Sequence, residues 1–462
     1  MSRKVKRFKR ILIANRGEIA LRVVEACREL GIQSVAVFSE PDRSLPHVQL
    51  ADVAFCIGPA SAGESYLDIP VLMSVAELSG TDAVHPGYGF LAEDPHFVEI
   101  CEESGLVFIG PSHRTMVEAG DKLIAKRKVA KAEVPVIPGS EGVVRTEDEL
   151  LEVTNELGYP LIIKATASGG GRGMRVVQQE DQIRLFQAFH AVRREAEAGF
   201  GTSDVYVERY IPNPKHIEVQ ILADRAGNVI HWGERDCSIQ RRHQKLIEEA
   251  PAPGLNAATR NRIHQAAIQA AKALDYQNVG TVEFIVAGDV LYFLEINARI
   301  QVEHPISEMI TDRDLIKEQI RLAEGEKLGY SQQEVQFRGH AIECRINAED
   351  PYDGFRPSSG RIRLKQLPGG SGVRIDTHLF DGLEITPHYD SMLAKLIVYG
   401  QDRTEARIKM IGALERFDVD GVKTTRDLCR ETITHPTFVA GKADTGFLTS
   451  EILEVHPSRQ TT

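Results

Sequence analysis

Two patterns of hydrophobic and polar residues divide the chain, and the first occupies roughly its opening 110 positions. Short apolar runs that predict strands lie at 11–14, 34–38, 83–85 and 107–109. Stretches with helical periodicity lie at 19–30, 70–79 and 95–104. Strands that alternate with helices form parallel sheets covered by those helices. The N-terminal part is therefore predicted to be a Rossmann-like parallel α/β domain.

The second pattern alternates polar and apolar residues at every step and dominates the C-terminal half. Residues 295–303 carry Glu, Asn, Arg, Gln and Glu at odd positions and Ile, Ala, Ile and Val at even ones. A strand there would place five polar groups on one face, which in a single segment is most simply a solvated surface. Residues 215–221 and 341–347 alternate in the same way. Several such strands in one domain predict a sheet whose polar face lines a cleft.

A β-hairpin predicted around residues 287–289 suggests a metal site. With a three-residue loop, the odd positions of both strands share one face, and Glu283 and Glu295 then lie diagonally across it, about 7 Å apart at the backbone. Two such carboxylates, with Asn297 as a neutral oxygen ligand, suit an Mg²⁺ ion that also binds nucleotide phosphates. A two-residue loop would put the carboxylates on opposite faces and exclude the site.

A glycine loop at residues 168–173 separates an apolar strand ending in Lys164 from a second strand at 174–177. Consecutive glycines let backbone N–H groups turn toward a phosphate, and the lysine adds a point charge. No Gly-Lys-Ser/Thr follows, so this is not a Walker loop, and a flexible hairpin tip is the alternative. The first strand–helix turn, at 14–19, has one glycine where a dinucleotide fingerprint needs three.

Basic residues gather at the end of segment 234–245, where Arg241, Arg242, His243 and Lys245 fall within five positions. Such a run is usually a solvated loop. Close to a predicted phosphate loop and a predicted metal face, binding of an anion becomes the favoured interpretation.

Composition narrows the class of protein. The chain has 462 residues, of which 42% are hydrophobic and 26% charged, enough for two or three packed domains. Its net charge of -11 argues against a nucleic-acid binder, and no stretch is long and apolar enough for a membrane span. The basic first ten residues lack the apolar run of a signal peptide. Six scattered cysteines suggest neither a zinc site nor a disulfide framework, so a cytoplasmic location is expected.

Four parts are predicted along the chain. They are an α/β domain at 1–113, a helical linker at 114–134, a small mobile lid around the glycine loop at 135–207, and a mixed-sheet C-terminal domain at 208–462.

These segments resemble biotin carboxylase, the ATP-grasp component of biotin-dependent carboxylases, from about residue 10 to about residue 453. The stretches that carry the resemblance are 13–20 (IANRGEIA), 85–91 (HPGYGFL), 120–122 (GDK), 169–177, 234–245, 248–253 (EEAPAP), 295–308 and 389–392 (YDSM). A lysine, a glycine lid and a Glu…Glu-x-Asn set alone indicate only the ATP-grasp superfamily. Segments 241–245 (RRHQK) and 299–305 (RIQVEHP) are typical of its bicarbonate-using branch. The lid departs from the pattern at 167–168, where relatives often carry glycine.

The resemblance implies roles for the residues at matching positions. Those implied for ATP are Lys122, Lys164, Gly170, Gly171, the segment from Glu208 to Ile211, His216, His243, Glu283 and Glu295. Those implied for the metal, Mg²⁺ or Mn²⁺, are Glu283, Glu295 and Asn297. Those implied for bicarbonate are Lys245, Arg299, Gln301, Val302 and Glu303, and for biotin Arg345 and Tyr88. The implied catalytic set is Arg299, Glu303, Lys245 and Arg345.

The activity implied by the resemblance is ATP-dependent carboxylation of biotin by bicarbonate through carboxyphosphate. This is the first half-reaction of acetyl-CoA carboxylase, which feeds fatty acid synthesis, or of a related acyl-CoA or pyruvate carboxylase. The chain shows no biotin-acceptor lysine and no carboxyltransferase domain, so a biotin carboxyl carrier protein and carboxyltransferase subunits are the expected partners, and a homodimer is the expected assembly. The alternatives are an ATP-grasp ligase that joins an amine to a carboxylate and a non-catalytic nucleotide-binding relative.

Overall fold

The computed structural model describes residues 5–166 and 173–455. The glycine loop, with the predicted phosphate contacts Gly170 and Gly171 and the departure at 167–168, lies outside these residues except for its last position. Among the described residues, the helices fall short of the combined length and apolarity that crossing a membrane requires.

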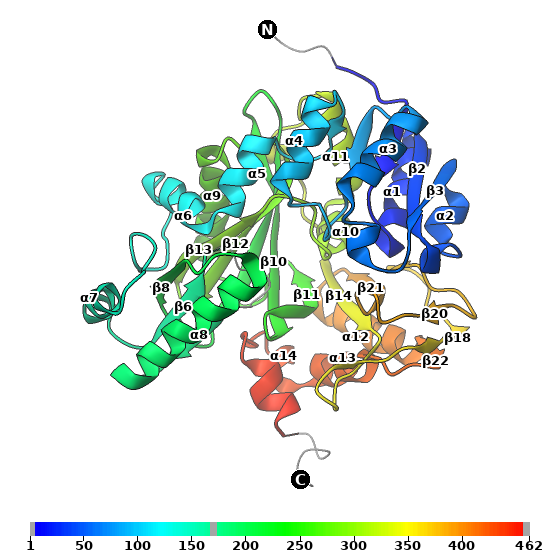
Figure 1. Ribbon diagram of the computed structural model, residues 1–462. Coiled ribbons are helices and arrows are strands. Elements are labelled where there is room, and N and C mark those ends of the chain that lie inside the picture. The colour runs from blue at the N-terminus through cyan, green and yellow to red at the C-terminus, as the bar shows by residue number, and fades with distance from the viewer. Residues whose placement is uncertain (1–4, 167–172, 456–462) are drawn as a thin grey trace.

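The N-terminal part is a parallel sheet of five strands in the order β3-β2-β1-β4-β5. It lies in the blue region of Figure 1, where β2 and β3 are labelled. The strands are β1 Arg10–Ile13, β2 Gln33–Ser39, β3 Val53–Gly58, β4 Ala83–His85 and β5 Val107–Phe108. The helices are α1 Gly17–Leu30, α2 Pro46–Leu50, α3 Ile69–Ser79 and α4 Pro95–Glu103. Ile11 and Ile13 pack against α1, while Leu12 packs on the other face with Leu72 of α3 and Phe97 of α4. The predicted parallel α/β domain is confirmed, with β3 as a further strand at its edge.

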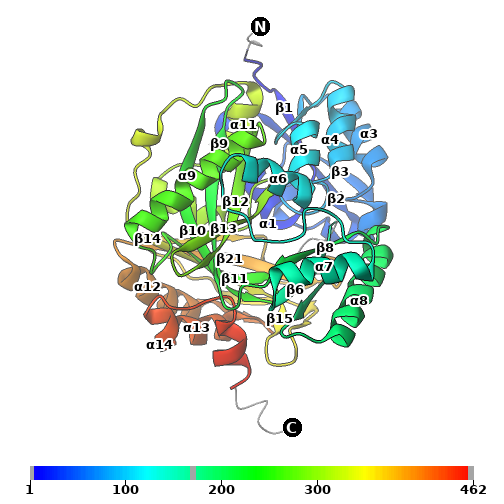
Figure 2. The same cartoon turned by 90° about the vertical axis from the view of Figure 1, so that its left-hand side faces the viewer.

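Two helices lead from this sheet to a smaller one. They are α5 His113–Gly120 and α6 Lys122–Lys131. The smaller sheet has the antiparallel order β7-β6-β8, with strands β6 Leu161–Ala165, β7 Met174–Val177 and β8 Val205–Arg209. Its helices are α7 Glu147–Leu157 and α8 Gln182–Phe200. Leu150 of α7 and Phe189 of α8 join the apolar face of this sheet in a separate small core, so the unit protrudes at one side of the molecule (Figures 1 and 2).

The largest sheet has eight antiparallel strands in the order β13-β12-β9-β10-β11-β14-β21-β19. They are β9 Lys215–Ala223, β10 Val229–Arg241, β11 Gln244–Ala250, β12 Asn278–Ala287, β13 Val290–Asn297, β14 His340–Asn347, β19 Val373–Thr377 and β21 Met392–Gly400. The accompanying helices are α9 Ala257–Ala273, α10 His304–Thr311, α11 Leu315–Glu324, α12 Arg403–Arg416, α13 Arg426–Thr434 and α14 Pro436–Val439. Short strands complete the C-terminal part: β15 Glu349–Asp350, β16 Arg356–Pro357, β17 Gly360–Arg361, β18 Arg363–Gln366, β20 Glu384–Ile385 and β22 Asp418–Asp420.

The predicted strand over residues 295–303 is wrong beyond its first three residues. Strand β13 ends at Asn297, and α10 begins at His304 after a bend and a turn. The backbone N–H of Ala298 donates to Glu93 of the N-terminal domain (3.0 Å) instead of to a neighbouring strand. Contact with another domain therefore ends the strand, which an alternating pattern cannot reveal.

The β12–β13 hairpin also differs from the prediction. Its loop has two residues, with Gly288 at φ 60°, and Ala287 pairs with Val290. That loop alone would have placed Glu283 and Glu295 on opposite faces. A β-bulge restores the match, because Phe284 pairs with Phe293 and the next pair is Glu283 with Glu295, which leaves one extra residue on β13. The two carboxylates are direct cross-strand neighbours rather than diagonal ones.

Candidate active site

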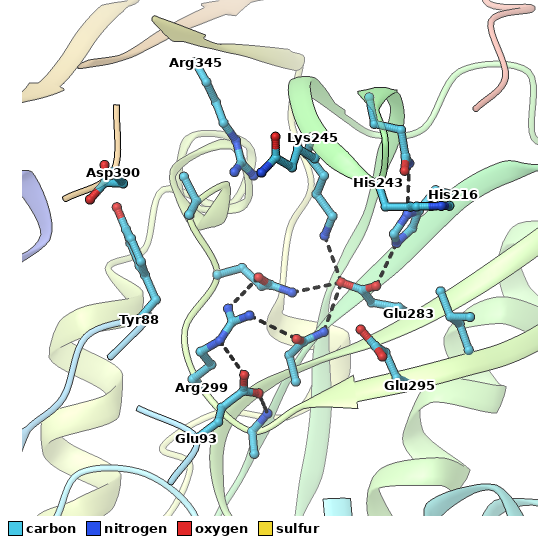
Figure 3. Close-up of a pocket in the computed structure, with 18 of the residues that line it drawn as sticks. Tyr88, Glu93, His216, His243, Lys245, Glu283, Glu295, Arg299, Arg345 and Asp390 are labelled. Carbon is cyan, nitrogen blue, oxygen red and sulfur yellow. Dashed lines mark hydrogen bonds and ion pairs between the residues drawn. The ribbon is translucent and has the colours of Figure 1, made fainter. Parts of the chain in front are cut away.

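A cleft of about 1070 Å³ lies where the N-terminal domain, the small sheet and the large sheet meet. Its walls include Tyr88 from the N-terminal domain, Lys164 from the small sheet, and Lys245, Glu283 and Arg345 from the large one. Figure 3 shows these side chains of the large sheet turned inward from several strands. The predicted polar face that lines a cleft is thereby confirmed.

Strand β9, next to β12 and β10, carries the centre of this polar face. His216, Glu218 and Gln220 alternate with the core residues Ile217 and Val219, and all three polar residues are buried. Buried charged groups require partners, since an isolated carboxylate in a low-dielectric interior is strongly unfavourable. The partners of Glu218 and its neighbours define the site.

Lys245 gathers three carboxylates at the floor of the cleft. Its Nζ donates to Glu218, to Glu283 at 2.8 Å and to Glu303 at 2.7 Å. Burial opposes the charged ammonium, but these three carboxylates hold the pKa of Lys245 well above its usual value. The ammonium form is therefore favoured, and Lys245 places a cation at the floor of the cleft.

The hairpin that carries Lys245 turns at two non-glycine residues with positive φ. Arg242 has φ 49° and His243 has φ 67°, a conformation that costs side-chain-bearing residues free energy unless the surroundings hold it. The turn directs His243 into the cleft beside His216 (Figure 3).

Glu303 lies between two cations. It occupies the N-cap position of α10 but caps no amide with its side chain; its carboxylate accepts from Lys245 and, at 2.8 Å, from Arg345 Nη2. Burial favours the neutral form, yet Lys245, Arg345 and Arg235 together hold the pKa of Glu303 well below its usual value. Glu303 is therefore ionised, as a proton acceptor must be.

Arg299 follows the end of β13 and is held by three side chains. Its Nε donates to Glu93 at 3.0 Å, Nη1 to Gln301 at 2.7 Å and Nη2 to Asn297 at 3.1 Å. Gln301 in turn donates to Glu283 at 3.0 Å. Through Gln301 and Glu283, Arg299 is therefore connected by hydrogen bonds to Lys245. Figure 3 shows Arg299, Glu283 and Lys245 on the same wall of the cleft.

Val302, the remaining residue of the predicted bicarbonate site, is held through its backbone. Its carbonyl oxygen accepts a hydrogen bond from Lys395 at 3.2 Å.

The predicted metal ligands fit a hard cation. Glu283 and Glu295 are paired across β12 and β13, and Asn297 donates through its amide to Glu283 at 3.0 Å. Burial favours the neutral form of Glu283, but Lys245 and His216 hold its pKa well below its usual value. Lys122 lies 3.0 Å from Glu295. Two carboxylates and an amide oxygen facing a cleft are the donor set that Mg²⁺ prefers.

At the predicted nucleotide end, Lys122, Lys164, Ile211, His216 and His243 all line the cleft. Figure 3 shows the two histidines near Glu283.

Glu208 is buried beside these residues and accepts from Lys164 at 2.7 Å and from Lys126 at 2.6 Å. Burial opposes its ionisation, yet the two lysines hold the pKa of Glu208 below its usual value. The side chain of Glu208 is thus committed to lysines, so its backbone is the part free for a nucleotide base.

The predicted biotin residues lie at the other end of the cleft. Arg345 donates through Nε to Glu248 at 2.6 Å, and Tyr88 donates to Glu18. Burial raises the pKa of Glu18 to about 7, although Lys395 opposes the shift. Tyr88 thereby has a fixed hydroxyl orientation at the wall opposite the large sheet.

Three residues of this network were missed from the sequence. Glu93 positions Arg299, Lys126 holds Glu208, and Arg235 is a fully buried partner of Glu218 at 2.5 Å. Lys126 lies four residues after Lys122 on α6, a spacing that puts both on one helix face and could have identified it. Nothing in the local pattern marks Glu93 or Arg235, since their partners lie far away in the sequence.

Three family models match the chain in succession. They are described as the biotin carboxylase N-terminal domain (residues 7–116), the carbamoyl-phosphate synthase L chain ATP-binding domain (121–331) and the biotin carboxylase C-terminal domain (343–450).

Two curated proteins illustrate the similarity. The chain is 51% identical to biotin carboxylase 1 of Bacillus subtilis, over 96% of this chain and 98% of that one. It is 49% identical to the biotin carboxylase of Pseudomonas aeruginosa, over 96% of this chain and 99% of that one.

Solved structures agree in fold. A biotin carboxylase complex from Campylobacter jejuni superposes with a TM-score of 0.93 at 46% identity, covering 96% of this chain and 98% of that one. The biotin carboxylase domain dimer of 2-oxoglutarate carboxylase from Hydrogenobacter thermophilus, described in complex with MgADP, ADP and bicarbonate, superposes with a TM-score of 0.92 at 47% identity, covering 96% and 97%. The ATP-grasp fold class predicted from the sequence is confirmed.

Proposed function

Because the chain belongs to the biotin carboxylase family of ATP-dependent ligases, we propose that Lys245, Arg299, Glu303 and Arg345 carry out the carboxylation of biotin in the cleft. The enzyme uses ATP and Mg²⁺, with biotin as the carboxyl acceptor. The observation that carries the assignment is the position of Glu303, whose carboxylate contacts Lys245 on one side and Arg345 on the other. One base thereby connects the predicted bicarbonate and biotin sites.

In the first step, Lys245 and Arg299 neutralise bicarbonate while Glu303 accepts its proton. Bicarbonate is a weak nucleophile, and loss of the proton lets its oxygen attack the γ-phosphorus of ATP in line, which forms carboxyphosphate and ADP. The contact of Glu303 with Lys245 supports this role, since an anion bound to Lys245 would lie beside the base.

The nucleotide is proposed to lie between the large and small sheets. Lys122 and Lys164 would contact its phosphates, His216 and His243 would complete its site, and the backbone from 208 to 211 would contact the base. When bound to Glu283, Glu295 and Asn297, Mg²⁺ would offset charge on the phosphate oxygens. Lys122 contacts Glu295 and Lys245 contacts Glu283, so two cations already lie beside these carboxylates.

In the second step, carboxyphosphate divides into carbon dioxide and phosphate, phosphate takes the proton from the ureido nitrogen of biotin, and that nitrogen attacks carbon dioxide to form carboxybiotin. The negative charge that moves to the ureido oxygen needs a cation within reach. Arg345 lines the cleft and is charged, and Tyr88 forms the facing wall. Burial of the closed site would keep water from the labile intermediate.

The partners and the oligomeric state are proposed from membership of the biotin carboxylase family. One of the solved relatives is a biotin carboxylase domain of 2-oxoglutarate carboxylase, and it is a dimer. A biotin carboxyl carrier protein would present biotin, carboxyltransferase subunits would accept the carboxyl group, and two copies of the chain would form a homodimer in the cytoplasm. The four-part division at 113, 134 and 207 is proposed likewise as the domain organisation.

Release of phosphate from ATP tests the function. The protein is assayed with Mg²⁺ alone, with bicarbonate, and with bicarbonate plus free biotin. Phosphate release should require bicarbonate and rise with biotin. A rate of phosphate release that neither bicarbonate nor biotin changes would refute the proposal. Phosphate release that requires an amine and a carboxylate would indicate the alternative ligase.

A further inference from the structure

Two buried glutamates lie behind Arg345 and have no role in the mechanism described above. Glu248 on β11 and Glu343 on β14 are paired directly across the two strands, and both side chains are fully buried. Directly opposed residues of neighbouring strands have Cβ atoms about 5 Å apart on the same face. Two carboxyl groups are therefore held together without access to solvent.

The oxygen atoms of this pair lack hydrogen-bond donors. Glu248 Oε1 accepts from Arg345, but Glu248 Oε2 and both oxygens of Glu343 have no partner within the described residues. Buried carboxylate oxygens without donors are unfavourable, and two opposed carboxylates also repel each other. A single proton held between the two groups would remove one negative charge and supply one donor, and the pair would titrate as a unit.

The cations near this carboxyl pair contact other groups. Lys395 on β21 lies by Glu18, Asp376 and the Val302 carbonyl, and Arg345 donates to Glu248 and Glu303.

The cross-strand neighbour of Glu343 on β21 is the apolar Ile397, which packs with Ile306 of α10. Lys245 of β11 is bound to other carboxylates. Burial and repulsion from Glu248 accordingly raise the pKa of Glu343 well above its usual value, against the opposing effect of Lys395 and Arg345.

We propose that Glu343 is a neutral carboxylic acid that donates its proton to Glu248 Oε2, and that this carboxyl pair positions Arg345 for the ureido oxygen of biotin. Glu248 holds Nε and Glu303 holds Nη2, so the guanidinium plane is set from two sides and Nη1 is left for the cleft. The part played by biotin rests on the proposed function; the shared proton does not.

Infrared spectroscopy tests the shared proton without any assay. The carbonyl band of a neutral, buried carboxylic acid should be present at pH 8 in the wild type and absent in Glu343→Gln. It should therefore remain as a positive band in the wild type minus Glu343→Gln difference, which cancels other buried acids such as Glu18. A difference spectrum without that band would overturn the proposal, whether or not the protein carboxylates biotin.

Kinetics test the positioning. Glu343→Gln retains a donor toward Glu248, whereas Glu343→Met has the same length and none. Glu343→Met should raise the KM for biotin by about tenfold, the size of one charge-assisted hydrogen bond, and leave bicarbonate-dependent ATP hydrolysis without biotin within about threefold. Glu343→Gln should restore the wild-type KM.

Two kinetic results would overturn the positioning role. One is a wild-type KM for biotin in Glu343→Met, and the other is equal damage in Glu343→Gln, which would indicate that Glu343 acts as a charge. A wild-type protein without bicarbonate-dependent hydrolysis would refute the proposed function instead, and the infrared result would still decide the shared proton.

Discussion

The two principal sheets bury their strands to a similar degree with opposite chemistry. In the N-terminal sheet, Ile11, Leu12 and Ile13 of β1 are apolar on both faces and fully buried. In the large sheet, Glu218 of β9 is as buried as its neighbour Val219. Burial alone therefore does not mean apolar packing; in the large sheet it means that charges have been enclosed and paired.

The energetic consequences of the two arrangements differ. Each large apolar side chain buried in the first sheet contributes about 1.5–3 kcal/mol to stability. An enclosed ion pair contributes little net stability, because desolvation offsets the attraction, yet the loss of one partner is severe. The polar face is thus better explained by chemistry than by folding, and the contrast can be tested from the largest expected effect downward.

Removal of the buried guanidinium of Arg235 should have the largest effect on stability. Arg235 is fully buried and donates to Glu218 at 2.5 Å, Gln220 at 2.7 Å and Ser307 at 3.0 Å. Arg235→Met should lower the free energy of unfolding by about 3–5 kcal/mol, because Glu218 is left buried and charged. Urea unfolding measures the loss. The double variant Arg235→Met/Glu218→Leu should recover a large part of it, and equal loss in both proteins would show that the ion pair is not the cause.

Removal of the proposed base or of one anion-binding cation should have an effect of nearly the same free energy. That effect should be on catalysis and not on the free energy of unfolding. Glu303→Gln or Arg299→Ala should reduce bicarbonate-dependent phosphate release about 10²–10³-fold, equivalent to roughly 3 kcal/mol of transition-state stabilisation. Binding of ATP, measured by calorimetry, should change little, since neither side chain is among the proposed nucleotide contacts. Normal turnover in either variant would contradict the assigned roles.

Acid should weaken the N-terminal domain through buried neutral histidines. Burial lowers the pKa of His47 to about 4, and its Nε2 lies 3.3 Å from the Val37 carbonyl of β2. The unfolded chain binds a proton below about pH 6.5 that the folded chain does not bind until about pH 4, so stability falls as pH is lowered across this window. The slope from this one group approaches about 1.4 kcal/mol per pH unit.

His47→Gln should flatten the pH dependence of urea unfolding in that window. An unchanged slope would mean that His47 is already protonated in the folded protein.

The smallest effect is expected from a conservative change in the apolar sheet. Ile13→Val removes one buried methyl group and should lower the free energy of unfolding by about 1 kcal/mol. Phosphate release per folded molecule should stay at the wild-type rate, because Ile13 packs against α1 and away from the cleft. A loss of activity without a loss of stability would show that the two sheets are coupled more closely than their packing indicates.

Much of the fold followed from local pattern. The apolar runs of the N-terminal domain became β1, β2, β4 and β5, and its amphipathic stretches became α1, α3 and α4. The strand β3 escaped notice because it lies at the sheet edge, where Ile57 is its only buried residue.

Polar alternation identified β9 and β14 as strands with a polar face, yet its simplest interpretation, a solvated surface, applied to neither.

The sequence by itself determined the α/β unit, the identity of the charged residues and, through resemblance, the family. Periodicity and motifs are properties of short segments, so they can be recognised without knowing where a segment lies in the fold. Tertiary structure alone decided that a β-bulge brings Glu283 opposite Glu295, that Glu93 ends β13, and that Lys245 meets its three carboxylates. These outcomes depend on backbone register and on contacts between distant segments, which a pattern of residue types does not encode.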